Sequence, residues 1–146
     1  MRVLIDADGC PVVDIAVRAA RKHHIPVVLF CDTSHHFDLD GADTVTLSQG
    51  ADSADLALVN NAQPGDIVIT QDYGLAALAL AKNALCMDQN GRAYTADNID
   101  GLLMSRHQAR KIRNAGGRLK GGPKRTRDED MRFLAAFEKW LPDNAG

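Results

Sequence analysis

The sequence is poor in cysteine and has no long apolar run. Its three cysteines, Cys10, Cys31 and Cys86, are an odd number and form no CxxC pair, so neither a disulfide framework nor a structural zinc site is expected. A reducing cytoplasm is therefore the default location. The longest unbroken apolar run covers only residues 75–81, far short of the roughly 20 residues of a membrane helix. Asp6 interrupts the first apolar stretch, which argues against a signal peptide and hence against secretion.

Acidic residues are unevenly distributed, both in kind and in position. Of the 19 acids, 17 are Asp and only Glu129 and Glu138 are Glu. Residues 1–104 carry 14 acids against six bases, whereas residues 105–127 carry nine Lys or Arg and no acid. The short Asp side chain holds its carboxylate close to the backbone, which suits caps, turns and metal sites. The pattern fits a protein that gathers carboxylates at one site and presents a basic segment to an anionic partner.

The 146 residues, 45% of them hydrophobic and 25% charged, are typical of one folded domain. Continuous rather than alternating apolar runs predict strands that are covered on both faces, as in a parallel sheet. Because such runs alternate with helical stretches, we expect an α/β domain with a mostly parallel sheet. The predicted strands are residues 2–6, 27–31, 44–47, 66–70 and 84–87, and the predicted helices are residues 11–23, 52–61, 73–82, 96–114 and 128–140.

The C-terminal part of the chain differs from the rest in composition. Gly116 and Gly117 should end the helix at 96–114, because glycine readily ends helices. A basic, Gly-rich arm is expected at about 115–127, followed by a C-terminal helix at about 128–141. We expect residues 1–146 to form a single domain that includes both segments.

Acidic side chains follow two of the predicted strands. Asp6 ends the first strand and Asp8 comes two residues later, while Asp72 stands just beyond the strand at 66–70. In a sheet whose strands lie in the order 3-2-1-4-5, the first and fourth strands are neighbours. Their carboxyl ends then flank the crevice in which open α/β sheets bind ligands. The sequence therefore predicts that these three carboxylates converge.

Two further carboxylates, Asp52 and Asp55, lie at the start of a predicted helix and are spaced to share one face. Carboxylates gathered within a few ångströms repel one another unless a cation neutralises them. All-oxygen ligands favour Mg²⁺ or Mn²⁺ over zinc, and such ions activate water in phosphodiester cleavage. A structural reading stays open, because Asp also caps helices and turns.

Four motifs carry a resemblance to a known family. They are Asp6-Ala-Asp8-Gly-Cys10-Pro11-Val12, Gly50-Ala-Asp52-Ser53-Ala54-Asp55, Ile69-Thr-Gln-Asp72-Tyr-Gly-Leu75-Ala76 and Gly121-Gly-Pro123-Lys124. Through them nearly the whole chain resembles the YaiI/YqxD family of bacterial proteins, which looks like a branch of the PIN-like nuclease superfamily. The resemblance implies a PIN-like three-layer fold. It also implies metal ligands at Asp6, Asp52 and Asp72, with Asp8 and Asp55 as additional members. The superfamily commonly has Glu at the middle position, so this chain departs from the pattern at Asp52.

The basic segment is the candidate contact with nucleic acid. Each cation near a phosphate releases counterions, which makes such binding sensitive to salt. No aromatic residue occurs between Tyr94 and Phe133, so the segment is not expected to stack bases or to read sequence. A solvated basic surface is the alternative reading. The predicted contacts are Arg106, Arg110, Arg113, Arg118, Lys120, Lys124 and Arg125.

Three functions fit these patterns. The first is a metal-dependent nuclease acting on RNA, or on DNA, with Asp6, Asp8, Asp52 and Asp72 as catalytic residues and Mg²⁺ or Mn²⁺ as cofactor. The second is a phosphatase that resembles the haloacid dehalogenases, with Asp6 as the phosphorylated nucleophile and Asp8 as acid or base. The phosphate-binding Lys expected there is not evident, because the only upstream Lys is Lys22 in the first helix. The third is a non-catalytic RNA-binding protein whose carboxylates hold a structural ion.

Overall fold

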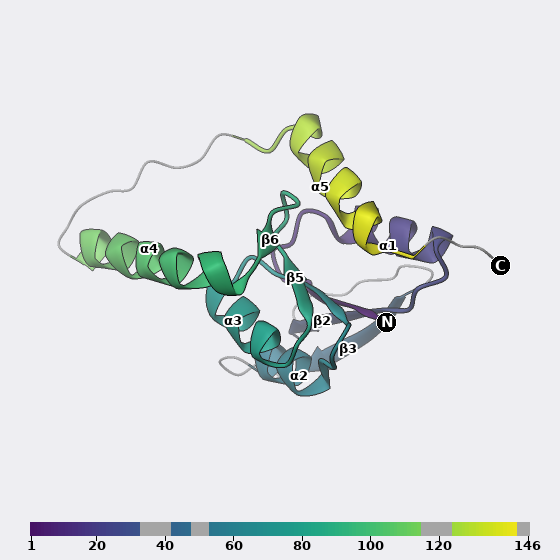
Figure 1. Ribbon diagram of the computed structural model, residues 1–146, viewed down its shortest axis with the longest axis horizontal. Helices are drawn as coiled ribbons and strands as arrows, with labels where there is room; N and C mark the ends of the chain where they lie inside the picture. The colour runs from purple at the N-terminus through teal and green to yellow at the C-terminus, as the bar shows by residue number, and fades with distance from the viewer. Residues whose placement is uncertain (33–41, 48–52, 115–123, 143–146) are drawn as a thin grey trace.

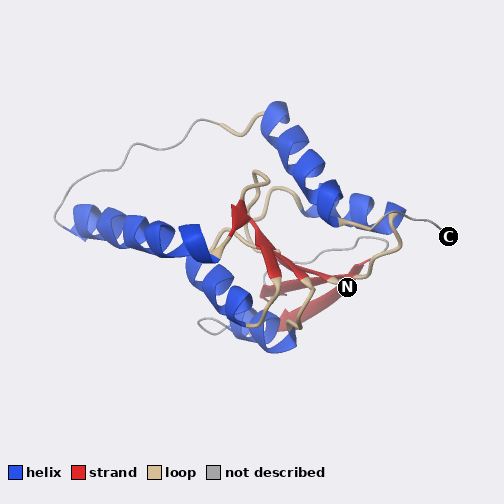
Figure 2. Cartoon of the chain, in the orientation of Figure 1, coloured by secondary structure: helices blue, strands red, loops and turns tan. Residues whose placement is uncertain are grey.

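The computed structural model describes residues 1–32, 42–47, 53–114 and 124–142, and it has the predicted α/β architecture. A single sheet lies between helices on both of its faces (Figure 2). The strands are β1 (Val3–Asp6), β2 (Val27–Asp32), β3 (Ala42–Leu47), β4 (Ile67–Ile69), β5 (Leu85–Met87) and β6 (Ala93–Tyr94). The helices are α1 (Val13–Lys22), α2 (Ser53–Asn61), α3 (Tyr73–Ala81), α4 (Ala96–Asn114) and α5 (Arg127–Trp140).

The sheet has one strand more than the predicted order 3-2-1-4-5. Its six strands lie in the order β3-β2-β1-β4-β5-β6. Strands β1 to β5 pair in parallel, whereas β6 pairs antiparallel to β5, with Cys86 opposite Tyr94. Only two residues form β6, which is too short for an alternating apolar pattern to develop. This is why the sequence did not predict it.

Strand β1 shows why the central strands are apolar without interruption. Val3, Leu4 and Ile5 are all fully buried. Because successive side chains of a strand point to opposite faces, Val3 and Ile5 join one apolar cluster and Leu4 joins the other. The prediction of strands that are covered on both faces is confirmed.

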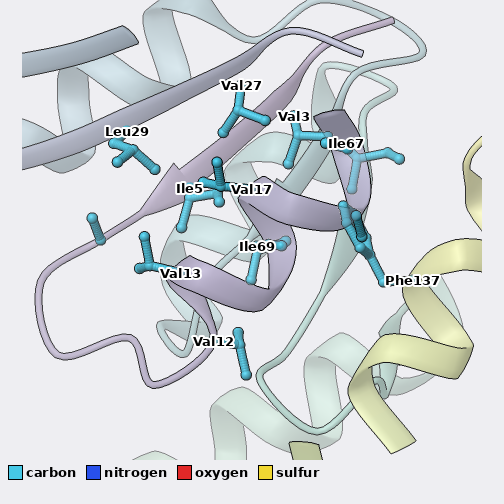
Figure 3. Close-up of a cluster of buried hydrophobic side chains, with 14 of the residues drawn as sticks. Val3, Ile5, Val12, Val13, Val17, Val27, Leu29, Ile67, Ile69 and Phe137 are labelled. Atoms are coloured by element: carbon cyan, nitrogen blue, oxygen red, sulfur yellow. The ribbon is translucent and has the colours of Figure 1, made fainter. Parts of the chain in front are cut away.

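Helices α1 and α5 cover one face of the sheet and lie together in the same part of Figure 1. Val13 and Val17 of α1 and Phe137 of α5 point toward the side chains of β1, β2 and β4 (Figure 3). Phe133 and Phe137 stack with their ring centroids 5.4 Å apart. Helix α5 begins with a capping box, in which the Thr126 hydroxyl accepts from the Glu129 backbone N–H.

Helices α2 and α3 cover the other face, and α4 packs against α3 (Figure 1). Leu58 of α2 and Leu75 and Ala79 of α3 form this second cluster with Leu4 of β1 and Ile99 of α4. Within the residues that the structure describes, no helix is long and apolar enough to cross a membrane.

An ion pair between a buried acid and a partly exposed arginine lies at the amino end of the two central strands. Asp66, directly before β4, is only 4% exposed. Its Oδ2 lies 2.9 Å from Nη2 of Arg2, and its carboxylate also accepts from the backbone N–H groups of Arg2 and Gln63, each at 3.0 Å. This carboxylate is therefore matched by a cation and by two backbone donors, which satisfies a buried acid.

Candidate functional site

Asp6 and Thr70 meet at the carboxyl ends of β1 and β4. The parallel register pairs Ile5 with Ile69. The residues that follow them, Asp6 and Thr70, therefore lie side by side. The Thr70 hydroxyl donates to Asp6 Oδ2 at 2.9 Å. These two strands are central in the sheet, at the point where its topology reverses, and open α/β sheets bind ligands there.

Asp72 is linked to the same threonine and begins α3. Its backbone N–H donates to Thr70 Oγ1 at 3.0 Å. Its own Oδ1 accepts from the backbone N–H groups of Gly74 at 2.8 Å and Leu75 at 3.2 Å, as an N-cap residue does. The Asp72 carboxylate is thus fixed in orientation by the helix that it caps.

The electrostatics of Asp6 show that further acids lie near it. The pKa of Asp6 is raised from its ordinary 3.8 to about 6, mainly by burial and to a smaller extent by the negative charges of Asp55, Asp72 and Asp8, while the Thr70 hydrogen bond acts to lower it. Asp8 comes from the loop after β1, and Asp55 comes from the first turn of α2. We call Asp6, Asp8, Asp55 and Asp72 the acidic cluster. An acid in such surroundings is costly to ionise.

The structure brings four of the five predicted acidic residues to one edge of the sheet. The fifth, Asp52, lies outside the described residues. Among the described residues, no group of three or more His, Cys, Asp or Glu side chains is arranged so that it could hold a metal ion. The convergence that the sequence predicted is therefore electrostatic, and metal binding by these residues stays a prediction.

Two hollows adjoin the acidic cluster and share Asp72. The first, of about 390 Å³, is lined by Asp6, Gln71, Asp72 and Tyr73. The second, of about 340 Å³, lies between α2 and α3 and is lined by Asp55, Leu56, Val59, Asp72, Gly74, Leu75 and Leu78. The first lies at the strand ends, and we call it the polar recess after the two carboxylates and the amide that line it beside a tyrosine ring. The second is lined mainly by apolar side chains together with two carboxylates.

Three residues at this edge were not singled out from the sequence. Thr70 connects Asp6 to Asp72, Tyr73 lines the polar recess, and Gln71 Nε2 donates to the Gly9 carbonyl at 2.9 Å. All three flank Asp72 in the segment that follows β4. Gln71 and Tyr73 stand directly beside Asp72 in the sequence, a signal that could point to them, whereas Thr70 stands two residues away and has no such signal.

Cys10 lies near the acidic cluster, and burial favours the protonated, weakly nucleophilic form of its thiol. Burial raises the pKa of its thiol to about 11, so the thiol stays protonated at neutral pH. The Sγ atom of Cys10 therefore serves packing, beside the apolar cluster under α1 and α5.

The predicted nucleic-acid contacts are only partly described. The helix that carries Arg106, Arg110 and Arg113 is α4, whose backbone extends to Asn114, but their side chains and all of Arg118 and Lys120 lie outside the described residues. Lys124 is exposed. Nucleic-acid binding by these residues stays a prediction.

Arg125, the last of the predicted contacts, ties the start of α5 to the β5–β6 turn. Its Nε donates to Asp130 Oδ1 at 2.6 Å, its Nη1 to Asn90 Oδ1 at 2.7 Å and its Nη2 to the Gln89 carbonyl at 2.6 Å. Gly91 of the same turn has a φ of +83° and packs so tightly that a Cβ there would lie 2.9 Å from Ala136 Cβ of α5. Arg125 thus has a role in the fold whatever else it contacts.

Comparison with known proteins identifies close relatives. Residues 4–143 match the sequence profile of a family described as "Uncharacterized BCR, YaiI/YqxD family". A UPF0178 protein from Exiguobacterium sibiricum is 54% identical over 143 residues, which cover 98% of each chain. UPF0178 proteins from Alkaliphilus oremlandii and Clostridium acetobutylicum are 49% and 48% identical, and the match covers 99% and 97% of this chain and 93% and 97% of theirs. No solved structure matches the chain.

Proposed function

This chain belongs to the YaiI/YqxD family, and we propose that it is a metal-dependent nuclease with a PIN-like domain that hydrolyses phosphodiester bonds, with RNA as the favoured substrate. One observation carries the proposal. The pKa of Asp6 is raised to about 6 by burial and by three neighbouring aspartates. At neutral pH the negative charges of the acidic cluster repel one another and lower the stability of the folded protein. A bound divalent cation would neutralise this repulsion.

The chemistry of the cluster suits Mg²⁺ or Mn²⁺ in kind. All its donors are oxygens, which these ions prefer. The described residues provide no group of three ligands by themselves, but Mg²⁺ usually keeps several waters and takes only one or two carboxylates together with substrate phosphates. Asp6 and Asp72 would hold the ion, with Asp52 as a further ligand and Asp8 and Asp55 completing the set. A bound ion of this kind activates water and stabilises the leaving oxygen.

The residues of the chain have separate tasks in this proposal. Thr70 orients the Asp6 carboxylate through the 2.9 Å hydrogen bond, and the N-cap bonds of α3 orient Asp72. Held in these orientations, both carboxylates could bind the cation that would supply an activated water. Asp8 would orient that water.

The basic segment would hold the substrate in place. Residues 105–127 contain nine Lys or Arg and no acid, a composition that attracts the phosphates of nucleic acid. The rest of the chain is acidic, so this segment would also offset the repulsion between the protein and its anionic substrate. Cleavage is accordingly expected to weaken as salt concentration rises.

The test compares the wild type with Asp6→Asn and Asp72→Asn on single-stranded RNA, in Mn²⁺, in Mg²⁺ and in a chelator. Both amides fill nearly the same space, and Asn also caps helices well, so both variants should fold. Each is expected to lower metal-dependent cleavage by about 100-fold or more. Asp43→Asn is the matched control, because Asp43 is an exposed acid in the amino-terminal part of β3, and its cleavage rate should equal that of the wild type. Cleavage by a purified Asp6→Asn/Asp72→Asn double variant at the wild-type rate would overturn the proposal.

The phosphatase alternative is less well supported by the arrangement of the strands. Asp66, which together with Asp72 resembles the last acidic motif of such phosphatases, lies at the amino end of β4 and pairs with Arg2. Lys22 is the last residue of α1, which returns from the carboxyl end of β1 to the amino end of β2. Neither residue is therefore at the edge of the sheet where Asp6 lies.

The non-catalytic alternative is separated by the same assay. RNA binding that depends on salt, shows no turnover in either metal ion and is unchanged by Asp6→Asn would favour a binding protein.

A further inference from the structure

An aromatic ring lies beside the acidic cluster. Tyr73 is the first residue of α3, and it lines the polar recess of about 390 Å³ together with Asp6, Gln71 and Asp72. It is partly exposed. A tyrosine ring in the wall of a recess offers a flat, apolar surface, which suits a ligand with a flat, apolar part.

The ring is held in place by buried neighbours. Its centroid lies 5.9 Å from that of Tyr94, with the two planes at 65°, an edge-to-face arrangement. Tyr94 is only 3% exposed, and its hydroxyl donates to the Thr70 carbonyl at 3.0 Å. Thr70 is also the residue that binds Asp6. A continuous set of contacts thus fixes the aromatic ring relative to the carboxylates.

We propose that Tyr73 is the stacking platform for a nucleobase next to the phosphodiester at the acidic cluster, and that the substrate is single-stranded nucleic acid. This inference rests on the proposed nuclease function and specifies its substrate. Every base presents a π-face to an aromatic side chain, so stacking needs no particular sequence. In a duplex that face is covered by the neighbouring base pair, and a paired strand cannot use the ring without unstacking.

The chemistry of the recess suits this ligand. A nucleotide combines a flat base with a charged phosphate, and the recess combines a ring with carboxylates that would act on phosphate through a cation. Gln71 is also at its rim, where its amide already donates to the Gly9 carbonyl. The stacking surface is supplied by the domain itself, whereas residues 105–127 contain no aromatic residue.

The first experiment measures binding of two eight-nucleotide probes in Ca²⁺, with gel analysis to verify that the probes stay intact. One probe is oligouridylate, and the other is the same ribose-phosphate backbone without bases. Wild type should bind oligouridylate about tenfold or more tightly than the abasic probe. Tyr73→Phe keeps the ring and should keep this preference, whereas Tyr73→Leu keeps the apolar bulk and should lose it. A Tyr73→Leu protein that still prefers the probe with bases, or a wild type that binds both equally, would overturn the inference.

A second experiment reads stacking directly and checks that the variants fold. Trp140 is the only tryptophan of the chain, so Tyr73→Trp in a Trp140→Phe background reports on position 73 alone. Its fluorescence should be quenched by oligouridylate and not by the abasic probe. An unquenched signal at saturating oligouridylate would contradict stacking. Circular dichroism of each variant shows whether the fold is intact.

The two proposals can fail separately. If the wild type cleaves RNA in an Asp6-dependent way but Tyr73→Leu binds both probes as the wild type does, only the stacking inference fails. If no metal-dependent cleavage occurs but the preference for bases depends on the ring at position 73, the nuclease proposal fails and the stacking platform stands.

Discussion

Two aspartates stand at opposite ends of the central strand pair and have opposite surroundings. Asp66, at the amino end of β4, accepts hydrogen bonds from two backbone N–H groups and pairs with the Arg2 guanidinium. Asp6, at the carboxyl end of β1, accepts from the Thr70 hydroxyl and faces the negative charges of Asp55, Asp72 and Asp8. The first carboxylate is matched by a cation and by two backbone donors, whereas burial and like charges oppose ionisation of the second. A carboxylate that stands where its charge is costly to the fold is a sign of function.

The largest expected change in stability is at Asp66, at the amino end of β4. Asp66→Ala removes the buried partner of Arg2 and the acceptor of two backbone N–H groups, and it should lower the free energy of unfolding by about 3 kcal/mol at pH 7. Urea denaturation measures this loss. Asp43→Ala, at an exposed position of β3, serves as control and should change stability by less than about 0.5 kcal/mol. If Asp66→Ala lowers the free energy of unfolding by less than about 1 kcal/mol, the contrast drawn between Asp66 and Asp6 is wrong.

Asp6→Asn should raise the free energy of unfolding, whereas Asp66→Ala lowers it. The folded pKa of Asp6 is about 6, against an ordinary 3.8, so the folded protein holds a proton that the unfolded chain releases. Wild-type stability is therefore expected to fall as pH rises from about 4 to about 6, and to stay lowered above that range. At pH 7.5 the Asn variant should be more stable by about 2 kcal/mol, a value reduced for partial solvent screening.

Stability measurements at low pH are the control for the Asp6→Asn prediction. At pH values well below 3.8 the Asp6 carboxyl is neutral in both the folded and the unfolded chain. Residue 6 should then contribute equally to the free energy of unfolding of the wild type and of the Asn variant. Thermal unfolding across pH 3.5 to 8 tests the whole curve. A variant that is less stable than the wild type at pH 7.5 would contradict the electrostatic account of the acidic cluster.

The smallest effect concerns the residue that joins the two carboxylates. Thr70→Val removes the hydroxyl that donates to Asp6 and accepts from the Asp72 N–H, and it should cost about 1 kcal/mol of stability. Because this hydrogen bond lowers the pKa of Asp6, its loss should move that pKa above about 6. A pH titration of the side-chain carboxyl ¹³C signal of Asp6 measures the shift. An unchanged pKa would show that the Thr70 hydroxyl does not influence the ionisation of Asp6.

The convergence of Asp6, Asp8 and Asp72 could be predicted because it depends on few features. Uninterrupted apolar runs located the strands, and the reversal of strand order located the edge where their carboxyl ends meet. Thr70 could not be found in this way, since its bond to Asp6 depends on the register that pairs Ile5 with Ile69. Register between strands so far apart in the sequence leaves no local pattern.

Two other features were beyond the sequence for related reasons. Asp66 and Asp72 look alike as acids that flank one strand, but β4 separates them, and only the contact with Arg2 shows that Asp66 has a structural role. Arg125 belongs by composition to the basic segment. Its bonds to Asn90, Gln89 and Asp130 depend on α5 packing beside the β5–β6 turn, an arrangement set by the tertiary fold.

The hydrogen bond from Gln71 to the Gly9 carbonyl acts as a cross-brace at the edge of the sheet. Backbone pairing between β1 and β4 stops at Ile5 and Ile69, and the loops beyond it carry like charges that push apart. The bond links the two loops directly and so restrains their motion relative to each other. The entropy of arranging the carboxylates is thus lost during folding, before any cation or substrate arrives, and binding need not supply it.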